Sequence, residues 1–122
     1  MYQRLANASD IPAIIQFFKN EWGEDHIFAR KPHLLKWQFA RRDASFGQTD
    51  APCALTVWDD SNLVGMQGLI PTTFRTPWGT VSGVWLCNLM VAGGDRDKCV
   101  GVRLMAGVHR LRVARLRTTG FN

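Results

Sequence analysis

The sequence predicts an α/β (α+β) domain in which helices flank a mixed, mainly antiparallel sheet. Three observations support this prediction: an early apolar stripe at helical spacing, three strand-like runs in the middle, and a second stripe near the end. The chain has 122 residues, enough for one domain and too few for two, so we expect a single domain over residues 1–122. Its 46% of hydrophobic residues argues against disorder.

The first third of the chain predicts one strand and two helices. Residues 2–6 are typical of a short strand, and Ser9 or Asp10 is expected to cap a helix that ends at Gly23. Apolar residues recur along this helix at Ile11, Ile14, Ile15, Phe18 and Trp22. Pro32 is expected to open the second helix, and residues 41–52 to form a loop.

The rest of the chain predicts three strands, a helix and a last strand. The strands cover residues 54–58, 63–74 and 80–91, separated by turn-forming residues. A helix follows from about Cys99, and residues 113–119 are interpreted as one more strand. The buried stripe of that helix is expected to contain Val100, Leu104, Val108 and Leu111. The predicted order is therefore β-α-α-β-β-β-α-β.

A glycine-containing turn joins the third strand of this series to the following helix. Such a turn directs backbone N–H groups outward at the positive end of a helix dipole, where phosphate binds well. Arg96, Lys98 and Arg103 add positive side chains nearby. The segment reads Arg96-x-x-Cys99-x-Gly101, and an ordinary strand-to-helix turn is the alternative interpretation.

This segment resembles the acyl-CoA-binding signature of the GNAT superfamily of N-acyltransferases, Q/R-x-x-G-x-G/A. The order of the elements is also similar to that family up to its fifth strand. The resemblance covers essentially the whole chain, which stops before a further helix and two strands of the family's domain. Cys99 stands where the family usually has glycine, which permits the closest backbone approach.

The resemblance implies transfer of an acetyl group from acetyl-CoA to a primary amine, such as an amino sugar, a small amine or a protein terminus. The end of the fourth strand would pair with the pantetheine arm, and the N–H groups of the loop would hold the pyrophosphate. The cofactor-binding residues would be Leu89, Val91, Arg96, Lys98, Cys99, Val100, Gly101 and Val102. The thioester would lie near Asn88.

Candidate catalytic residues lie in the connection after the first helix. In a GNAT-like arrangement this connection is near the acceptor, so Glu24 or His26 could take the proton from the attacking amine. A solvated loop with a capping role is the alternative interpretation. Cys87 lies beside Asn88, but direct attack by an amine needs no cysteine nucleophile, so we expect Cys87 to pack in the core.

A second hypothesis is a catalytically inactive binding or assembly module, which Cys99 and the absent C-terminal elements would favour. Those absent elements would leave a sheet edge and an apolar face uncovered. We therefore expect a homodimer, with exchange of strands or helices between the subunits as one form of it.

Positive charge is concentrated at the end of the chain. Residues 96–117 hold seven basic side chains against Asp97 alone, whereas residues 1–95 hold eight basic and nine acidic ones. This charge could meet CoA, bind nucleic acid or form the exposed side of a helix. No interleaved aromatic residues accompany it, so a nucleic-acid partner is not expected.

Other classes of protein are excluded by simple patterns. No apolar run approaches the roughly 20 residues of a membrane helix, and we see no signal peptide, so we expect a cytoplasmic protein without a membrane partner. The three cysteines show no CxxC spacing, which argues against a disulfide framework and against a metal site.

Overall fold

The computed structural model describes residues 1–41 and 50–118 and has an α+β fold, as the sequence predicts. Four strands and four α-helices, with two short 3-10 segments, make up this part of the chain. They are β1 (Tyr2–Leu5), η1 (Ala8–Asp10), α1 (Ile11–Trp22), α2 (Ile27–Arg30), α3 (Pro32–Gln38), β2 (Ala54–Asp59), β3 (Asn62–Thr76), β4 (Gly79–Val91), η3 (Gly93–Lys98) and α4 (Val100–Thr118).

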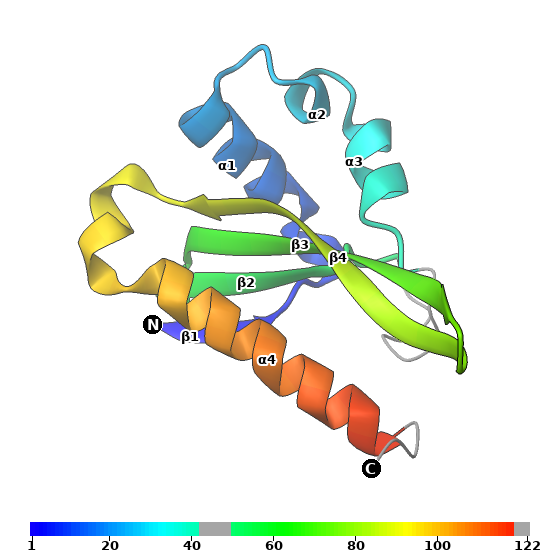
Figure 1. Ribbon diagram of the computed structural model, residues 1–122. Coiled ribbons are helices and arrows are strands. Elements are labelled where there is room, and N and C mark those ends of the chain that lie inside the picture. Colours follow the sequence, from blue (N-terminus) through cyan, green and yellow to red (C-terminus); the bar gives the residue numbers. More distant parts are fainter. Residues whose placement is uncertain (42–49, 119–122) are drawn as a thin grey trace.

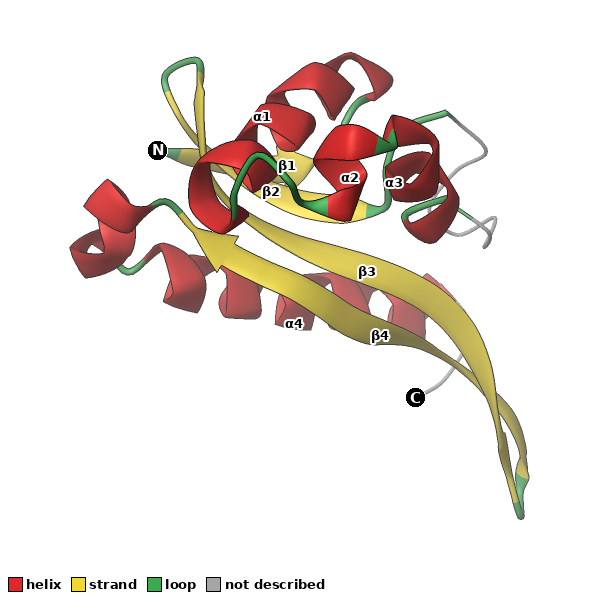
Figure 2. Cartoon of the chain, turned by 90° about the horizontal axis from the view of Figure 1, so that it is seen from above, coloured by secondary structure: helices red, strands yellow, loops and turns green. Residues whose placement is uncertain are grey.

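The sheet has the strand order β1-β2-β3-β4, and each neighbouring pair is antiparallel. Helices α1, α2 and α3 lie over one face, and α4 crosses the other (Figure 1). Strands β3 and β4 are much longer than the other two. They continue together as a two-stranded arm that reaches beyond the rest of the sheet (Figure 2).

Each face of the sheet has its own apolar core. On one face, fully buried side chains of the helical layer, Ile14, Phe18, Leu35 and Phe39, form one cluster with the fully buried Met66 of β3. On the other face, Val100 and Leu104 of α4 are fully buried against β2 and β3. Val108 and Leu111 pack there as partly buried residues, so the predicted stripe of this helix is confirmed.

The predicted last strand is wrong. Residues 113–118 continue α4, which runs without a break to Thr118, and Thr119 lies outside the described residues. Between Gly107 and Gly120 the sequence has neither glycine nor proline, and it is rich in arginine and leucine, which are strong helix formers. The alternation of arginine with apolar residues there imitated a strand, but helix propensity decides the structure.

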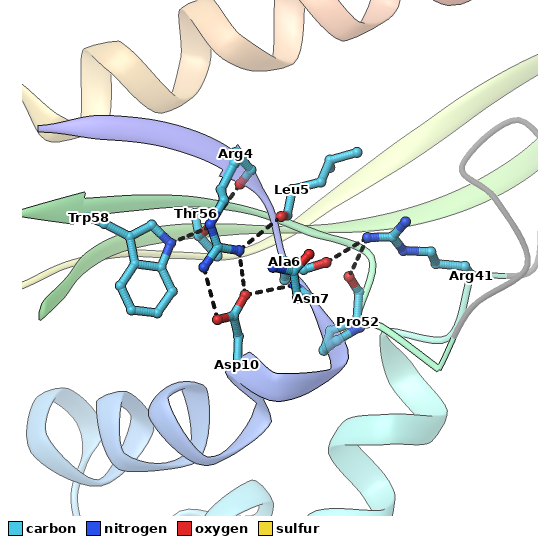
Figure 3. A network of polar contacts seen from close by, with 9 residues as sticks. All are labelled: Arg4, Leu5, Ala6, Asn7, Asp10, Arg41, Pro52, Thr56 and Trp58. Atoms are coloured by element: carbon cyan, nitrogen blue, oxygen red, sulfur yellow. Dashed lines mark hydrogen bonds and ion pairs between the residues drawn. The ribbon is translucent and has the colours of Figure 1, made fainter. Parts of the chain in front are cut away.

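A network of polar contacts fixes β1 against the start of α1 (Figure 3). The Arg4 guanidinium donates two hydrogen bonds to the Asp10 carboxylate, with N–O distances of 2.5 and 3.0 Å. The same carboxylate accepts the backbone N–H of Asn7 at 2.7 Å. Asp10 therefore anchors the turn between strand and helix, and its side chain does not cap α1 as expected.

Candidate functional site

A β-bulge divides β4 at the point where the sequence places the thioester. Met66 pairs with Met90 and Gly68 with Cys87, so β4 has one residue more than β3 between these pairs. Asn88 lies in this extra length and has a left-handed backbone, with φ of 52°. Asparagine tolerates that conformation better than most residues, and a bulge turns the strand locally. The strand is thus split into an outer part and an inner part, Asn88–Val91.

Two glutamine side chains stabilise the bulge, one from the neighbouring strand β3 and one from helix α3. Buried Gln67 donates from Nε2 to the carbonyl oxygen of Cys87 at 2.8 Å, which satisfies a backbone acceptor where the regular ladder is interrupted. Gln38, the last residue of α3, donates from Nε2 to Oδ1 of Asn88 at 3.0 Å. The side-chain orientation of Asn88 is therefore set by α3.

The turn after β4 leads the chain from this edge strand to the face of the sheet that α4 covers (Figure 1). Cys99 has φ of 57° and ψ of 31°, the left-handed conformation, and α4 begins at the next residue. The N–H of Arg103 donates to the carbonyl of Cys99 at 3.0 Å. The N–H groups of Val100, Gly101 and Val102 therefore belong to the first turn, which has no carbonyl acceptors within the helix.

Side chains fix this helix start in place while leaving its outer side open. Val100 is fully buried, and a Cβ on Gly65 would lie only 2.4 Å from its Cγ1, so strand and helix are in close contact. A Cβ on Gly101 would meet its nearest neighbour at 3.9 Å, and Val102 is exposed. A ligand could therefore approach the backbone at Gly101 and Val102.

The charges around this turn have both signs. The Lys98 ammonium lies 3.9 Å from the Asp59 carboxylate, and both side chains are about half exposed. Glu21 of α1 accepts the N–H of Gly93 at 3.4 Å. Asp59, Glu21 and Lys98 also line an open depression of about 600 Å³ between α1 and the β2–β3 turn. The carboxylates of this depression would repel a polyphosphate, whereas the N–H groups at the start of α4 would attract it.

The candidate bases Glu24 and His26 lie at the other end of α1. Glu24 is exposed in the turn after the helix. His26 caps α2 by accepting the N–H of Phe28 at its Nδ1, 3.2 Å away. Its ring packs on Phe18 and Trp22, with centroid distances of 4.8 and 5.0 Å. These contacts are those of a capping and packing histidine, and they are separate from the contacts of Asn88.

Cys87 lies beside the bulge, partly buried against the core under α1–α3. Burial raises the pKa of its thiol, which makes the nucleophilic thiolate scarcer at neutral pH. Among the side chains that the structure describes, which exclude those of residues 95–97, there is no group of three or more His, Cys, Asp or Glu arranged to hold a metal ion. None of the described helices combines the length and the apolar character needed to cross a bilayer.

The cofactor-binding residues predicted from the sequence lie on one continuous segment. In the structure Asn88, Leu89 and Val91 form the end of β4, and residues 98–102 run from the end of η3 into the first turn of α4. Sequence reasoning missed Gln38 and Gln67. Gln67 is a polar residue inside the otherwise apolar run of residues 63–71, which was the available signal. Gln38 gave no signal, because its role depends on how α3 docks. The Arg96 side chain lies outside the described part.

Comparisons with known proteins support the fold and go no further. No family model matches the chain, and no curated protein matches it. Among solved structures, the crystal structure of a transcriptional regulator from Bacillus halodurans C-125 matches with a TM-score of 0.62. The alignment covers 98% of this chain and 75% of that one, at 14% sequence identity. At such an identity the likeness shows the fold alone.

Proposed function

We propose that the chain binds an acyl-CoA, acetyl-CoA in the first instance, along the inner part of β4 and the start of α4. The observation that carries the proposal is the combination of two neighbouring features. The inner part of β4, next to the bulge at Asn88, has a free edge in the described sheet that could meet the pantetheine amides, and the first turn of α4 offers N–H groups to the pyrophosphate. These are the positions that the GNAT-like signature indicates.

The reaction that this arrangement suits best is transfer of the acyl group to a primary amine. A neutral amine attacks the thioester carbonyl near Asn88, the tetrahedral adduct expels the CoA thiolate, and the amine nitrogen loses a proton. Glu24 is the candidate that could accept this proton, because Glu24 is exposed, whereas the ring of His26 packs on Phe18. The class of amine is left open in this proposal.

A second candidate function is a catalytically inactive binding or assembly module. Two observations favour it. Cys99 places a side chain at a left-handed position beside the proposed pyrophosphate, and the His26 ring is engaged in capping and packing. Such a module would keep the fold and lose the chemistry.

Calorimetric titration with acetyl-CoA tests the first proposal. We expect saturable binding by the native chain and its loss in Gly101→Asp, because a carboxylate would repel phosphate at the first turn of α4. Met105→Asp is the matched control, with the same charge change one turn further along the same helix. Both variants should remain folded, since Gly101 has space for a Cβ and Met105 is 46% exposed.

The Cys99→Gly variant separates the two candidate functions. If only this variant binds acetyl-CoA, the side chain of Cys99 prevents binding in the native chain, and the inactive module is the better description. If neither chain binds, the acyl-CoA proposal is wrong. If the native chain binds, a panel of primary amines then tests for turnover by release of free CoA thiol.

We also propose that the chain forms a homodimer, independently of whether it binds CoA. The support is the exposed edge of β4, a strand that has no charged residue and that exposes the apolar side chains of Trp85, Leu86 and Leu89.

A further inference from the structure

Before the bulge, over residues 79–87, the outer edge of β4 lacks the protective features that natural edge strands carry. Residues 79–91 contain no charged residue and no proline. In the described sheet β4 has a neighbour on one side only. Trp85 and Leu86 are 59% and 42% exposed there, on opposite faces of the strand. A long apolar edge without charges tends to pair with another strand.

The second edge of the same arm is protected. Pairing between β2 and β3 ends at Gly68, the N–H of Leu69 still donates to the carbonyl of Cys53, and beyond this point β3 continues to Thr76 beside β4 (Figure 2). This outer part of β3 contains Pro71, which has no N–H to donate, and Arg75, which carries charge. The two edges of one hairpin therefore differ, and only the β4 edge is suited to receive another strand.

We infer that a second copy of this chain pairs antiparallel with residues 79–87 of β4, about a twofold axis at Gly83. This inference gives the surface and the register of the homodimer proposed above, and it rests on that proposal. Residues 79–87 form the uninterrupted stretch between the hairpin turn and the bulge, and Gly83 is its midpoint.

The composition of the strand favours its own copy as the occupant. A charged side chain near the axis of a twofold pairing would lie close to the same charge on the partner, and β4 has no charged residue. The register places Trp85 opposite Val81 of the second copy, a pairing of aromatic and β-branched residues that stabilises sheets. At the axis Gly83 has no side chain. The ring of Phe74 fills that space, because a Cβ on Gly83 would lie 2.6 Å from it.

The bulge keeps the dimer surface apart from the proposed acyl-CoA site. Asn88 ends the straight outer stretch, and the inner part of β4 continues in a different register with β3. A second copy on residues 79–87 therefore leaves Leu89 and Val91 free to meet pantetheine. Dimerisation and CoA binding should be compatible.

Sedimentation equilibrium with a matched pair of variants tests the surface. Ser82 and Thr73 are cross-strand partners in the arm, and both are exposed. We expect the native chain to be a dimer. Ser82→Lys should weaken it by about tenfold or more, because two lysines would face the interface. Thr73→Lys makes the same change on the β3 edge and should leave the mass unchanged.

The outcomes test self-association and the β4 surface separately. A monomeric native chain at every concentration overturns self-association. A native dimer that survives Ser82→Lys, or that is dissociated equally by both variants, overturns the β4 surface while leaving self-association intact. Circular dichroism of both variants confirms that the fold is kept.

Disulfide cross-linking tests the register in chains whose Cys87 and Cys99 are replaced by serine. Ser82 of one copy should lie opposite Val84 of the other. A mixture of Ser82→Cys and Val84→Cys chains should therefore cross-link. Each variant alone should not, because its own positions would be about 8 Å apart, beyond the reach of a disulfide. Cross-linking of either variant alone, in place of the mixture, would overturn the axis at Gly83.

Discussion

The Nε2 of Gln38, at the end of α3, donates a hydrogen bond to Oδ1 of Asn88 in the bulge of β4, with a distance of 3.0 Å. Fifty residues separate the two in the sequence. The bond connects the helical layer to the one non-glycine residue of β4 that has a positive φ. The bulge is therefore held by its neighbours and does not depend on the strand alone.

Substitution of Asn88 should reveal the strain at this bulge. Valine is β-branched and poorly suited to a left-handed backbone, so we expect Asn88→Val to lower the free energy of unfolding by about 2 kcal/mol. Asn88→Gly keeps the backbone conformation and loses only the bond to Gln38, so it should cost about 1 kcal/mol or less. Urea denaturation measures both. Equal losses in the two variants would show that the backbone conformation is not the cause.

Cys99→Gly should stabilise the protein. Cys99 adopts the left-handed conformation, which costs a non-glycine residue about 1 kcal/mol, and its side chain is exposed. Glycine would remove that cost, although part of the gain is offset by the greater freedom of glycine in the unfolded chain. Thermal denaturation should show a higher Tm than that of Cys99→Ser, the control that keeps a side chain. A lower Tm for glycine would contradict this account.

The fold was predictable because its main signals are periodic. The stripe containing Ile14 and Phe18, and that containing Val100 and Leu104, have the spacing of helices buried on one side, and all four residues are fully buried. The last strand was mispredicted because residues 113–118 alternate locally, and a short window cannot show that α4 continues through them. Helix α2 was missed because it is a single turn, held by the His26 cap.

The candidate site was predictable only where it is continuous in the sequence. The turn from β4 into α4 carries its own pattern of glycine and basic residues, so its position followed directly. The bulge did not, because it arises from a mismatch between two strands, and only the pairing of Met66 with Met90 and Gly68 with Cys87 reveals it. The left-handed backbone of Cys99 was not predictable either, because glycine is the residue that adopts this conformation without strain.

Gly107→Ala should destabilise the contact of α4 with the sheet. A Cβ at this position would lie 2.5 Å from Oε1 of Gln3 and 2.6 Å from Cδ2 of Leu55. Alanine favours the helix by up to about 1 kcal/mol, but overpacking costs about 1–3 kcal/mol, so we expect a net loss. Gly101→Ala is the control in the same helix, where the nearest atom is 3.9 Å away. Urea denaturation should show a loss for residue 107 alone.

The ion pair of Arg4 and Asp10 should make stability depend on pH. The hydrogen bonds from Arg4, followed by that from the N–H of Asn7, hold the pKa of Asp10 below its ordinary value of 3.8, although burial opposes them. The folded protein therefore binds this proton less readily than the unfolded chain does. The resulting stability is present above about pH 4, and it is lost as the pH falls through the lowered pKa of the folded state.

Asp10→Asn removes this contribution and leaves the Arg4 guanidinium without its carboxylate. We expect a loss of about 1–2 kcal/mol at neutral pH, limited by the 32% exposure of the Arg4 side chain. The difference in unfolding free energy between the native chain and the variant should shrink as the pH falls below 4. Asp25→Asn, in the exposed turn after α1, is the control and should keep the native pH profile. A difference that stays constant from neutral to acidic pH would mean that packing around Asp10, and not its charge, stabilises the junction of β1 and α1.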